Sequence, residues 1–139
     1  MDQSSFHVST DKKKLNIDLI FEFLNKEAYW SPNRSRETVE KSIENSLCFG
    51  VYDKENNQVG FARIITDYSI YAYICDLFVI SSYRRLGLGK LLVKEMLRNP
   101  DLSLVKNWSL ATRDAHELYK KFGFINITNP ERLMSRTIQ

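Results

Sequence analysis

The amino-acid sequence predicts a single α/β domain, with a mixed and mostly antiparallel central sheet flanked by helices. Helix-type and strand-type patterns alternate along the chain, and three apolar strand-type runs stand close together in its middle. A chain of 139 residues with 43% hydrophobic residues has the composition of a globular protein and can bury a core without disulfides or metals. We therefore expect one domain over 1–139.

The first half of the chain is expected to place one short strand and two helices before the long strands. Residues 6–9 have the pattern of the short strand. Apolar residues recur every three or four positions over 16–26, which indicates an amphipathic helix. Ser35 is a suitable N-cap for a second, more polar helix over 35–46.

Three β-rich runs follow, over 47–53, 58–66 and 70–80, and are expected to form an antiparallel meander. A leucine-rich helix is expected over 87–98. A strand over 107–112 should lie parallel to the strand before it, because the intervening helix crosses over.

The last expected elements are a short helix over 114–123 and a strand over 124–128. Asp114 is the expected N-cap of that helix, and Gly123 is the expected stop.

The connection before the leucine-rich helix carries more glycine and charge than a turn requires. Residues 81–92 read SSYRRLGLGKLL, and no acidic residue stands between Asp76 and Glu95. Glycine permits close backbone approach, and a helix N-terminus offers unpaired N–H groups. The pattern therefore predicts a site for a phosphate-bearing ligand, although its glycine spacing fits neither a P-loop nor a dinucleotide fingerprint. The basic residues of this stretch are Arg84, Arg85, Lys90 and Lys94.

Two signatures resemble those of the GNAT superfamily of acyl-CoA-dependent N-acetyltransferases. The stretch from Arg84 to Gly89 matches that family's pyrophosphate loop, which has Arg or Gln, two variable residues, Gly, one variable residue and Gly or Ala. Downstream, Ala115, Leu118, Tyr119 and Gly123-Phe124 match its second signature. The resemblance covers roughly 15–128 and implies a GNAT-like sheet, splayed between the fourth and fifth strands, with acetyl-CoA as co-substrate in the opening.

The resemblance also implies a role for Tyr119, which would protonate the departing coenzyme A thiolate. A phenol with a pKa of about 10 is protonated at neutral pH, as a general acid must be. The alternative for this tyrosine is apolar packing on its helix.

Asp76 is the odd carboxylate in an apolar run, and buried carboxylates need a partner or a purpose. Paired with an arginine such as Arg63 it would be structural, whereas in a cleft it would be the general base for the acceptor amine. Both interpretations stay open, and Asp67 is a second candidate for the base.

Further contacts are expected around the cofactor and the acceptor. One of the expected acceptor contacts, Trp30, could instead pack over the core. The expected cofactor contacts are Leu77, Phe78, Val79, Arg84, Arg85, Leu86, Gly87, Leu88, Gly89 and Lys90. The expected acceptor contacts are Tyr29, Trp30, Arg34, Arg63 and Asp67.

The expected function is direct transfer of an acetyl group from acetyl-CoA to a primary amine of a small molecule or peptide. The alternative is a non-catalytic acyl-CoA-binding regulatory module. A net charge of +3 is too small to indicate nucleic acid, no apolar run approaches the length of a membrane helix, and two histidines without clustered ligands do not indicate a metal. Cys48 and Cys75 in apolar runs, without a signal peptide, predict reduced thiols and a cytoplasmic location. The acceptor and the oligomeric state, a homodimer included, are left open.

Overall fold

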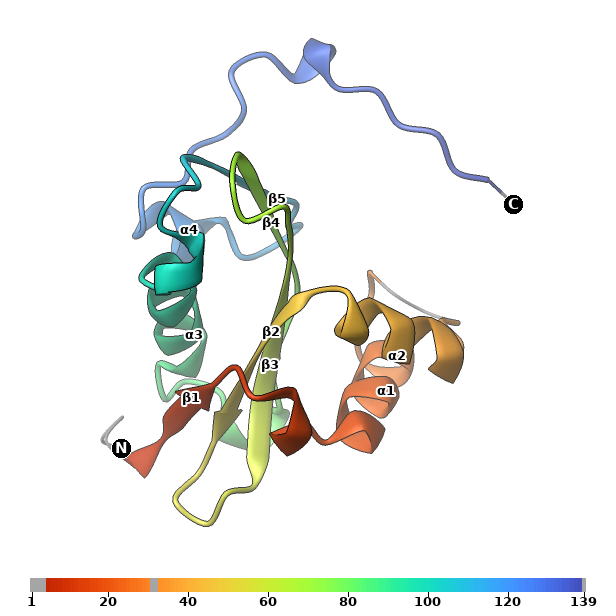
Figure 1. The fold of residues 1–139 in the computed structure, drawn as a ribbon, viewed down its shortest axis with the longest axis vertical. Coiled ribbons are helices and arrows are strands. Elements are labelled where there is room, and N and C mark those ends of the chain that lie inside the picture. Colours follow the sequence, from red (N-terminus) through yellow and green to blue (C-terminus); the bar gives the residue numbers. More distant parts are fainter. Residues whose placement is uncertain (1–4, 31–32, 139) are drawn as a thin grey trace.

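The computed structural model describes residues 5–30 and 33–138. Its strands form one five-stranded sheet in the order β1-β2-β3-β4-β5, with α1 and α2 on one side and α3 and α4 on the other (Figure 1). The first three pairings are antiparallel, and β4 and β5 are parallel. The predicted mixed, mostly antiparallel sheet is confirmed. The strands are β1 (His7–Ser9), β2 (Leu47–Tyr52), β3 (Gln58–Thr66), β4 (Tyr71–Val79) and β5 (Asn107–Leu110), and the α-helices are α1 (Ile17–Lys26), α2 (Arg36–Glu44), α3 (Leu88–Leu97) and α4 (His116–Lys120).

The first two helices begin where local capping chemistry predicts. The side chain of Asn16 accepts a hydrogen bond from the Leu19 N–H at the start of α1. Ser35 accepts from the Thr38 N–H in the same way at the start of α2, which confirms the predicted cap. The apolar faces that follow pack on the sheet and give it a core on each side, with α1 and α2 over one face and α3 over the other.

Strand β4 contains a bulge where it passes the middle of β3. Phe61 pairs with Phe78 and Arg63 pairs with Cys75, so that two residues of β4 lie opposite one residue of β3. Asp76 lies in this bulge with a φ of 54°. A bulge turns a side chain away from the regular alternation, and this one brings the Asp76 carboxylate into contact with the segment between α1 and α2.

Two predictions for the C-terminal part are wrong. The N-cap of helix α4 is Ala115 rather than Asp114, and no side chain caps this helix; the Ala115 N–H donates to the Thr112 hydroxyl in the loop before it. Residues 124–128 form no strand, because no neighbouring strand lies along the outer edge of β5 within the described chain to complete their hydrogen bonding. The stop at Gly123 is confirmed, with a φ of 90°.

Two kinds of structural feature are missing from residues 5–30 and 33–138. No helix there has both the length and the apolar composition that crossing a bilayer requires. No group of three His, Cys, Asp or Glu side chains in these ranges is arranged to hold a metal ion.

Candidate active site

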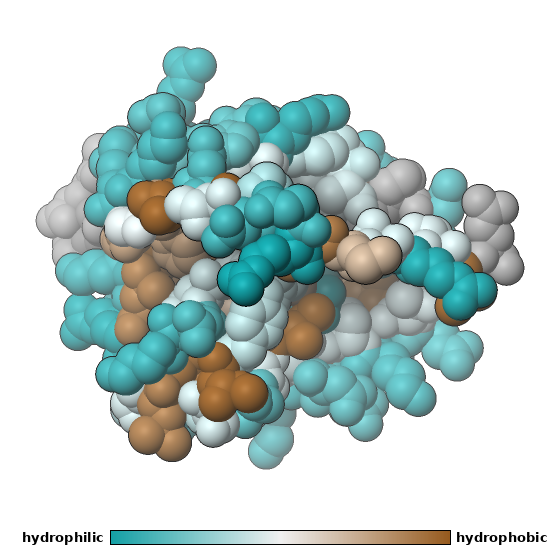
Figure 2. Space-filling model, turned by 90° about the horizontal axis from the view of Figure 1, so that it is seen from above, coloured by the Kyte–Doolittle hydropathy of each residue, from teal (hydrophilic) through white to brown (hydrophobic). Residues whose placement is uncertain are grey.

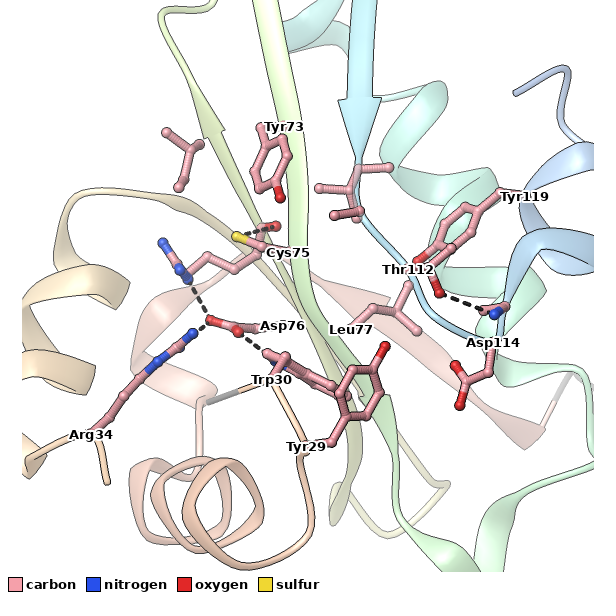
Figure 3. Close-up of a pocket in the computed structure, with 15 residues that line it drawn as sticks. Tyr29, Trp30, Arg34, Tyr73, Cys75, Asp76, Leu77, Thr112, Asp114 and Tyr119 are labelled. Carbon is pink, nitrogen blue, oxygen red and sulfur yellow. Dashed lines mark hydrogen bonds and ion pairs between the residues drawn. The ribbon is translucent and has the colours of Figure 1, made fainter. Parts of the chain in front are cut away.

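The site lies where β4 and β5 part. Their pairing runs only from Tyr71 with Asn107 to Ile74 with Leu110, and β4 then continues to Val79 paired with β3 alone. The backbone groups of β4 that face the opening therefore lack a neighbouring strand. A pocket of about 320 Å³ lies here between β4, the segment before α2 and the start of α4 (Figure 3).

Asp76 forms the floor of this pocket on the side of α2. Its Oδ1 accepts a hydrogen bond from the Trp30 indole at 2.8 Å, and its Oδ2 accepts from Arg34 and Arg63, each at 2.9 Å (Figure 3). Arg63 also donates to the Ser46 hydroxyl at 2.9 Å. The Asp76 side chain is only 1% exposed.

The ionisation of Asp76 follows from these contacts. Burial is the largest single influence and acts to raise its pKa, but the hydrogen bond from Arg34 and the charges of Arg63 and Arg34 together outweigh burial, so the pKa lies below its ordinary value. A carboxylate that accepts three hydrogen bonds and resists protonation is a weak base. The geometry thus favours the structural interpretation of Asp76.

Tyr119 lies across the pocket from β4, on the second turn of α4. It is buried, and its ring meets that of Phe124 edge to face with centroids 5.7 Å apart. Burial, with smaller contributions from Tyr29 and Cys75, raises the pKa of Tyr119 to about 12. Its hydroxyl therefore carries a proton throughout the physiological pH range, as a proton donor requires.

The glycine-rich loop forms a second hollow, of about 390 Å³, at the other end of the free part of β4. Arg85 and Gly87 both have positive φ, at 68° and 81°, and Gly87 is the N-cap of α3. The Arg84 side chain donates to the Val79 carbonyl at 3.1 Å and ties the loop to β4. The hollow thus lies directly at a helix N-terminus.

Positive charge is concentrated around the loop. The pKa of Lys90 is lowered because the side chain of Lys121 lies beside it. Lys90 stands in the first turn of α3, whereas Lys121 is the C-cap of α4. The two ammonium groups repel each other, Lys90 also opposes the α3 dipole, and a bound anion relieves both effects.

Residues 44–126, more than half of the chain, match the family described as the acetyltransferase (GNAT) domain. The chain belongs to the GNAT family. A crystal structure from Xanthomonas campestris pv. campestris, of a protein described as belonging to the GNAT family, is 40% identical with a TM-score of 0.91, covering 96% of this chain and 93% of that chain. The match confirms the splayed GNAT fold.

Curated relatives match shorter parts of this GNAT chain. The GCN5-related N-acetyltransferase 3, chloroplastic, of Arabidopsis thaliana is 48% identical over 48% of this chain and 28% of its own length. The uncharacterized N-acetyltransferase ycf52 of Pyropia yezoensis is 34% identical over 52% of this chain and 42% of its own length. The chain thus spans between 28% and 60% of the curated relatives that it matches.

The expected cofactor contacts fall into three groups in this GNAT domain. Leu77 lines the pocket, whereas Phe78 is buried against Phe23, with ring centroids 3.9 Å apart, and offers only its backbone. Leu86 packs against the core and lines neither hollow. The residues that line the loop hollow are Val79, Arg84, Arg85, Gly87, Leu88, Gly89 and Lys90, together with Tyr83 and Leu118.

Four of the five expected acceptor contacts line the pocket, namely Tyr29, Trp30, Arg34 and Arg63. Asp67 is the exception. Its Oδ1 accepts backbone N–H groups in the hairpin turn between β3 and β4, which lower its pKa, and it does not line the pocket.

One end of the pocket is closed by a contact between segments far apart in the sequence. The Tyr29 hydroxyl accepts the Arg113 N–H at 3.0 Å. The Arg113 guanidinium also lies over the Tyr29 ring, 3.7 Å from its centroid. The segment after α1 and the loop before α4 thus meet over the opening.

Sequence reasoning missed Asp114 as a pocket residue. This exposed carboxylate lines the pocket near Tyr29 (Figure 3), and within the described residues it takes part in no ion pair. The sequence predicts this residue as the N-cap of the helix, but the N-cap is Ala115.

Cys75 also lines the pocket, but its thiol is not activated. Burial raises the pKa of Cys75 to about 11, and a thiol becomes a nucleophile only as the thiolate.

Proposed function

We propose that this chain transfers an acetyl group from acetyl-CoA to a primary amine of a small molecule or peptide by direct attack in a ternary complex. The observation that carries this proposal is that the pocket and the loop hollow follow one another along the part of β4 that β5 leaves uncovered. Val79 and Leu118 line the hollow, while Leu77 and Tyr119 line the pocket. A cofactor held by its phosphates at the loop would therefore present its thioester at Tyr119.

The proposed reaction uses groups on both sides of the opening. The neutral amine attacks the thioester carbonyl carbon, and a backbone N–H of β4 near Phe78 or Val79 polarises the carbonyl oxygen. The carbon–sulfur bond then breaks, and the Tyr119 hydroxyl gives its proton to the departing thiolate. No covalent enzyme intermediate is required.

The proton of the acceptor ammonium requires a base. Asp76 was one candidate, but its three hydrogen bonds and lowered pKa make it a poor acceptor of protons. Asp114 lines the same pocket without an ion pair among the described residues. Asp114 therefore holds the ammonium and receives its proton, directly or through water, while Asp76 shapes the acceptor wall.

We expect Asp114→Asn to lower kcat/KM for the amine by roughly 10²-fold, because a positioned base contributes about that much. Acetyl-CoA affinity should not change, because Asp114 does not line the loop hollow. The matched control is Glu117→Gln, which removes one negative charge from the same helix region without touching the pocket. Steady-state kinetics that place both variants at the wild-type level would remove Asp114 from the mechanism.

We expect Arg85 to act in opposite directions on binding and stability. Arg85→Gly and Arg85→Ala should both weaken acetyl-CoA binding, by roughly fivefold, because both remove a charge at the loop hollow. Since Arg85 has a φ of 68°, only glycine relieves the backbone strain, and the glycine variant should be more stable than the alanine variant by about 1 kcal/mol. Titration calorimetry and urea unfolding measure the two effects. Equal stability of the two variants would show that the loop is not strained.

The proposed activity is tested by following thiol release from acetyl-CoA over a panel of small amines and peptides. Release that requires an amine, with the acetylated amine identified by mass spectrometry, supports the proposal. Acetyl-CoA binding without release for any acceptor would favour the non-catalytic acyl-CoA-binding module.

A further inference from the structure

The charged side chains on the α2 side of the pocket carry an excess of positive charge. Arg34 and Arg63 each form an ion pair with the Asp76 Oδ2, both at 2.9 Å, and we call these three residues the arginine cluster. Two guanidinium charges and one carboxylate leave the cluster with one unit of positive charge. Within residues 5–30 and 33–138, neither arginine pairs with a second carboxylate. Because an unbalanced charge removed from water is costly, an anion bound in the pocket would stabilise the cluster.

Arg34 is the member of the cluster that a ligand can reach. Its side chain is 27% exposed, whereas those of Arg63 and Asp76 are 10% and 1% exposed. Within the described part of the chain, Arg34 donates through Nη1 to Asp76 and through neither of its other nitrogens. A guanidinium carries N–H donors on all three nitrogens in one plane, in a fork that matches a carboxylate. The donors of Arg34 that no described residue uses therefore suit the carboxylate of a ligand.

The opposite charge lies on the other side of the pocket. Asp114 lines the pocket from the loop before α4, whereas Arg34 lines it from the segment before α2 (Figure 3). Among the described lining residues, Asp114 is the only charged residue outside the arginine cluster. The wall also includes Tyr29, Trp30 and Leu77, whose side chains are mainly apolar. The pocket thus presents two opposite charges on opposite sides and a largely apolar wall.

The pocket is small and reaches the surface next to the β3–β4 hairpin. Its volume is about 320 Å³, which is the size of a site for a small molecule. Ile65 and Tyr73 pair across β3 and β4, both line the pocket, and Ile65 is 48% exposed. The end of the molecule that carries this hairpin exposes hydrophobic and hydrophilic side chains next to one another (Figure 2). A ligand in this pocket therefore has apolar contacts in addition to the two charges.

We propose that the acceptor is a small amino acid in which a short apolar chain separates the primary amine from the carboxylate. The carboxylate binds Arg34, and the amine lies at Asp114, on the side of Tyr119. This inference rests on the proposed acetyl transfer and narrows its acceptor class. The carboxylate takes no part in the bond changes already described, so Arg34 determines specificity and is not catalytic.

The charges also distinguish this acceptor from related molecules. A carboxylate carries one negative charge and balances the excess of the arginine cluster, whereas a phosphate monoester carries about 1.5 to 2 negative charges at neutral pH. An α-amino group and its carboxylate share a single carbon, so they cannot lie on opposite sides of the pocket. The reacting amine of an α-amino acid would therefore have to stand on its side chain.

The first test compares acceptors of equal length in the thiol-release assay. Linear ω-amino acids of increasing length are each paired with the ω-amino carboxamide and the ω-aminoalkyl phosphate, at equal concentrations of the neutral amine. At the best length, we expect kcat/KM for the amino acid to exceed that for the carboxamide by roughly 10- to 100-fold, mainly through KM, because the contact with Arg34 is charge-assisted. Equal kcat/KM for acid and carboxamide at every length, or a preference for the phosphate, would overturn the inference.

Arg34→Gln should abolish the preference for the carboxylate, so that the ratio of kcat/KM for acid and carboxamide falls to about one. Asp76 keeps hydrogen bonds from two other residues in this variant, which should preserve the fold. The matched control is Arg36→Gln, which removes the same charge from an arginine that has two exposed ion pairs and does not line the pocket. This control should keep the wild-type ratio. An unchanged ratio in Arg34→Gln would mean that Arg34 serves to hold Asp76 and does not select the acceptor.

A binding measurement on the wild-type chain does not depend on turnover. The N-acetylated ω-amino acid, which is the expected product, and its carboxamide are titrated by calorimetry with coenzyme A present. The acid should bind roughly tenfold more tightly or better, and this difference should disappear in Arg34→Gln. Equal binding of acid and carboxamide to wild type would contradict the inference whatever the turnover.

The inference and the proposed function fail in different ways. Acetylation of amines without a preference for a carboxylate would overturn the inference and leave the proposed acetyl transfer intact. Tighter binding of the acid without thiol release for any amine would support the carboxylate site and contradict acetyl transfer.

Discussion

Tyr119→Phe is expected to lower turnover by roughly 10²- to 10⁴-fold, the usual contribution of a positioned proton donor. The variant keeps the ring that packs on Phe124 and loses only the hydroxyl. Acetyl-CoA affinity should therefore stay within about twofold of wild type, since the loop hollow is untouched. Because the pKa of Tyr119 is raised to about 12, deprotonation of this phenol should not limit wild-type activity between pH 6 and 9.

The matched control is Tyr73→Phe. Tyr73 lines the same pocket from β4, so that its variant also loses one pocket hydroxyl. Its turnover should stay close to that of wild type. Rapid-mix measurement of thiol release separates the chemical step from product release, and an unchanged chemical rate in Tyr119→Phe would assign Tyr119 to packing alone.

Asp76→Asn is expected to lower the free energy of unfolding by about 3–5 kcal/mol, the cost of breaking a buried ion pair by removing one partner. Arg63 would be left with its charge buried and without a carboxylate. Asparagine is the appropriate replacement because Asp76 has a φ of 54°, which asparagine tolerates better than other residues of its size. The substitution thus removes the charge and leaves the bulge in place. Denaturant unfolding measures the loss.

The loss of stability caused by Asp76→Asn should become smaller as the pH falls. Since the folded-state pKa of Asp76 is lowered, its stabilisation is fully present above the unfolded pKa of about 4 and is lost as pH falls through the folded value. The difference in the free energy of unfolding between wild type and Asp76→Asn should therefore be smaller in acid than at neutral pH. The control is Asp18→Asn, which breaks an exposed ion pair with Arg36 and should change stability little. A stable Asp76→Asn variant with lost turnover would restore Asp76 as the general base.

Much of the fold was predictable because its signals are local. The caps at Asn16 and Ser35, and the β-rich runs of the meander, involve residues within a few positions of each other. The parallel pairing of β5 with β4 was predictable because a helix connects the two strands, and such crossover connections follow one handedness. The strand over 124–128 was mispredicted because a strand pattern specifies the faces of a strand but not the neighbour that completes its ladder.

The sequence by itself determined the family, the glycine loop from Arg84 to Gly89 and the short helix with Tyr119, since each is a contiguous pattern in which chemistry and spacing coincide. Only the tertiary structure decided the roles of the carboxylates. Asp76 meets Trp30 and Arg34, which are 46 and 42 positions away, and no local pattern reports such partners. Asp114 lines the pocket and is not the N-cap of α4, which is Ala115. A carboxylate's ionisation depends on which charges and donors surround it in space, and folding alone assembles those surroundings.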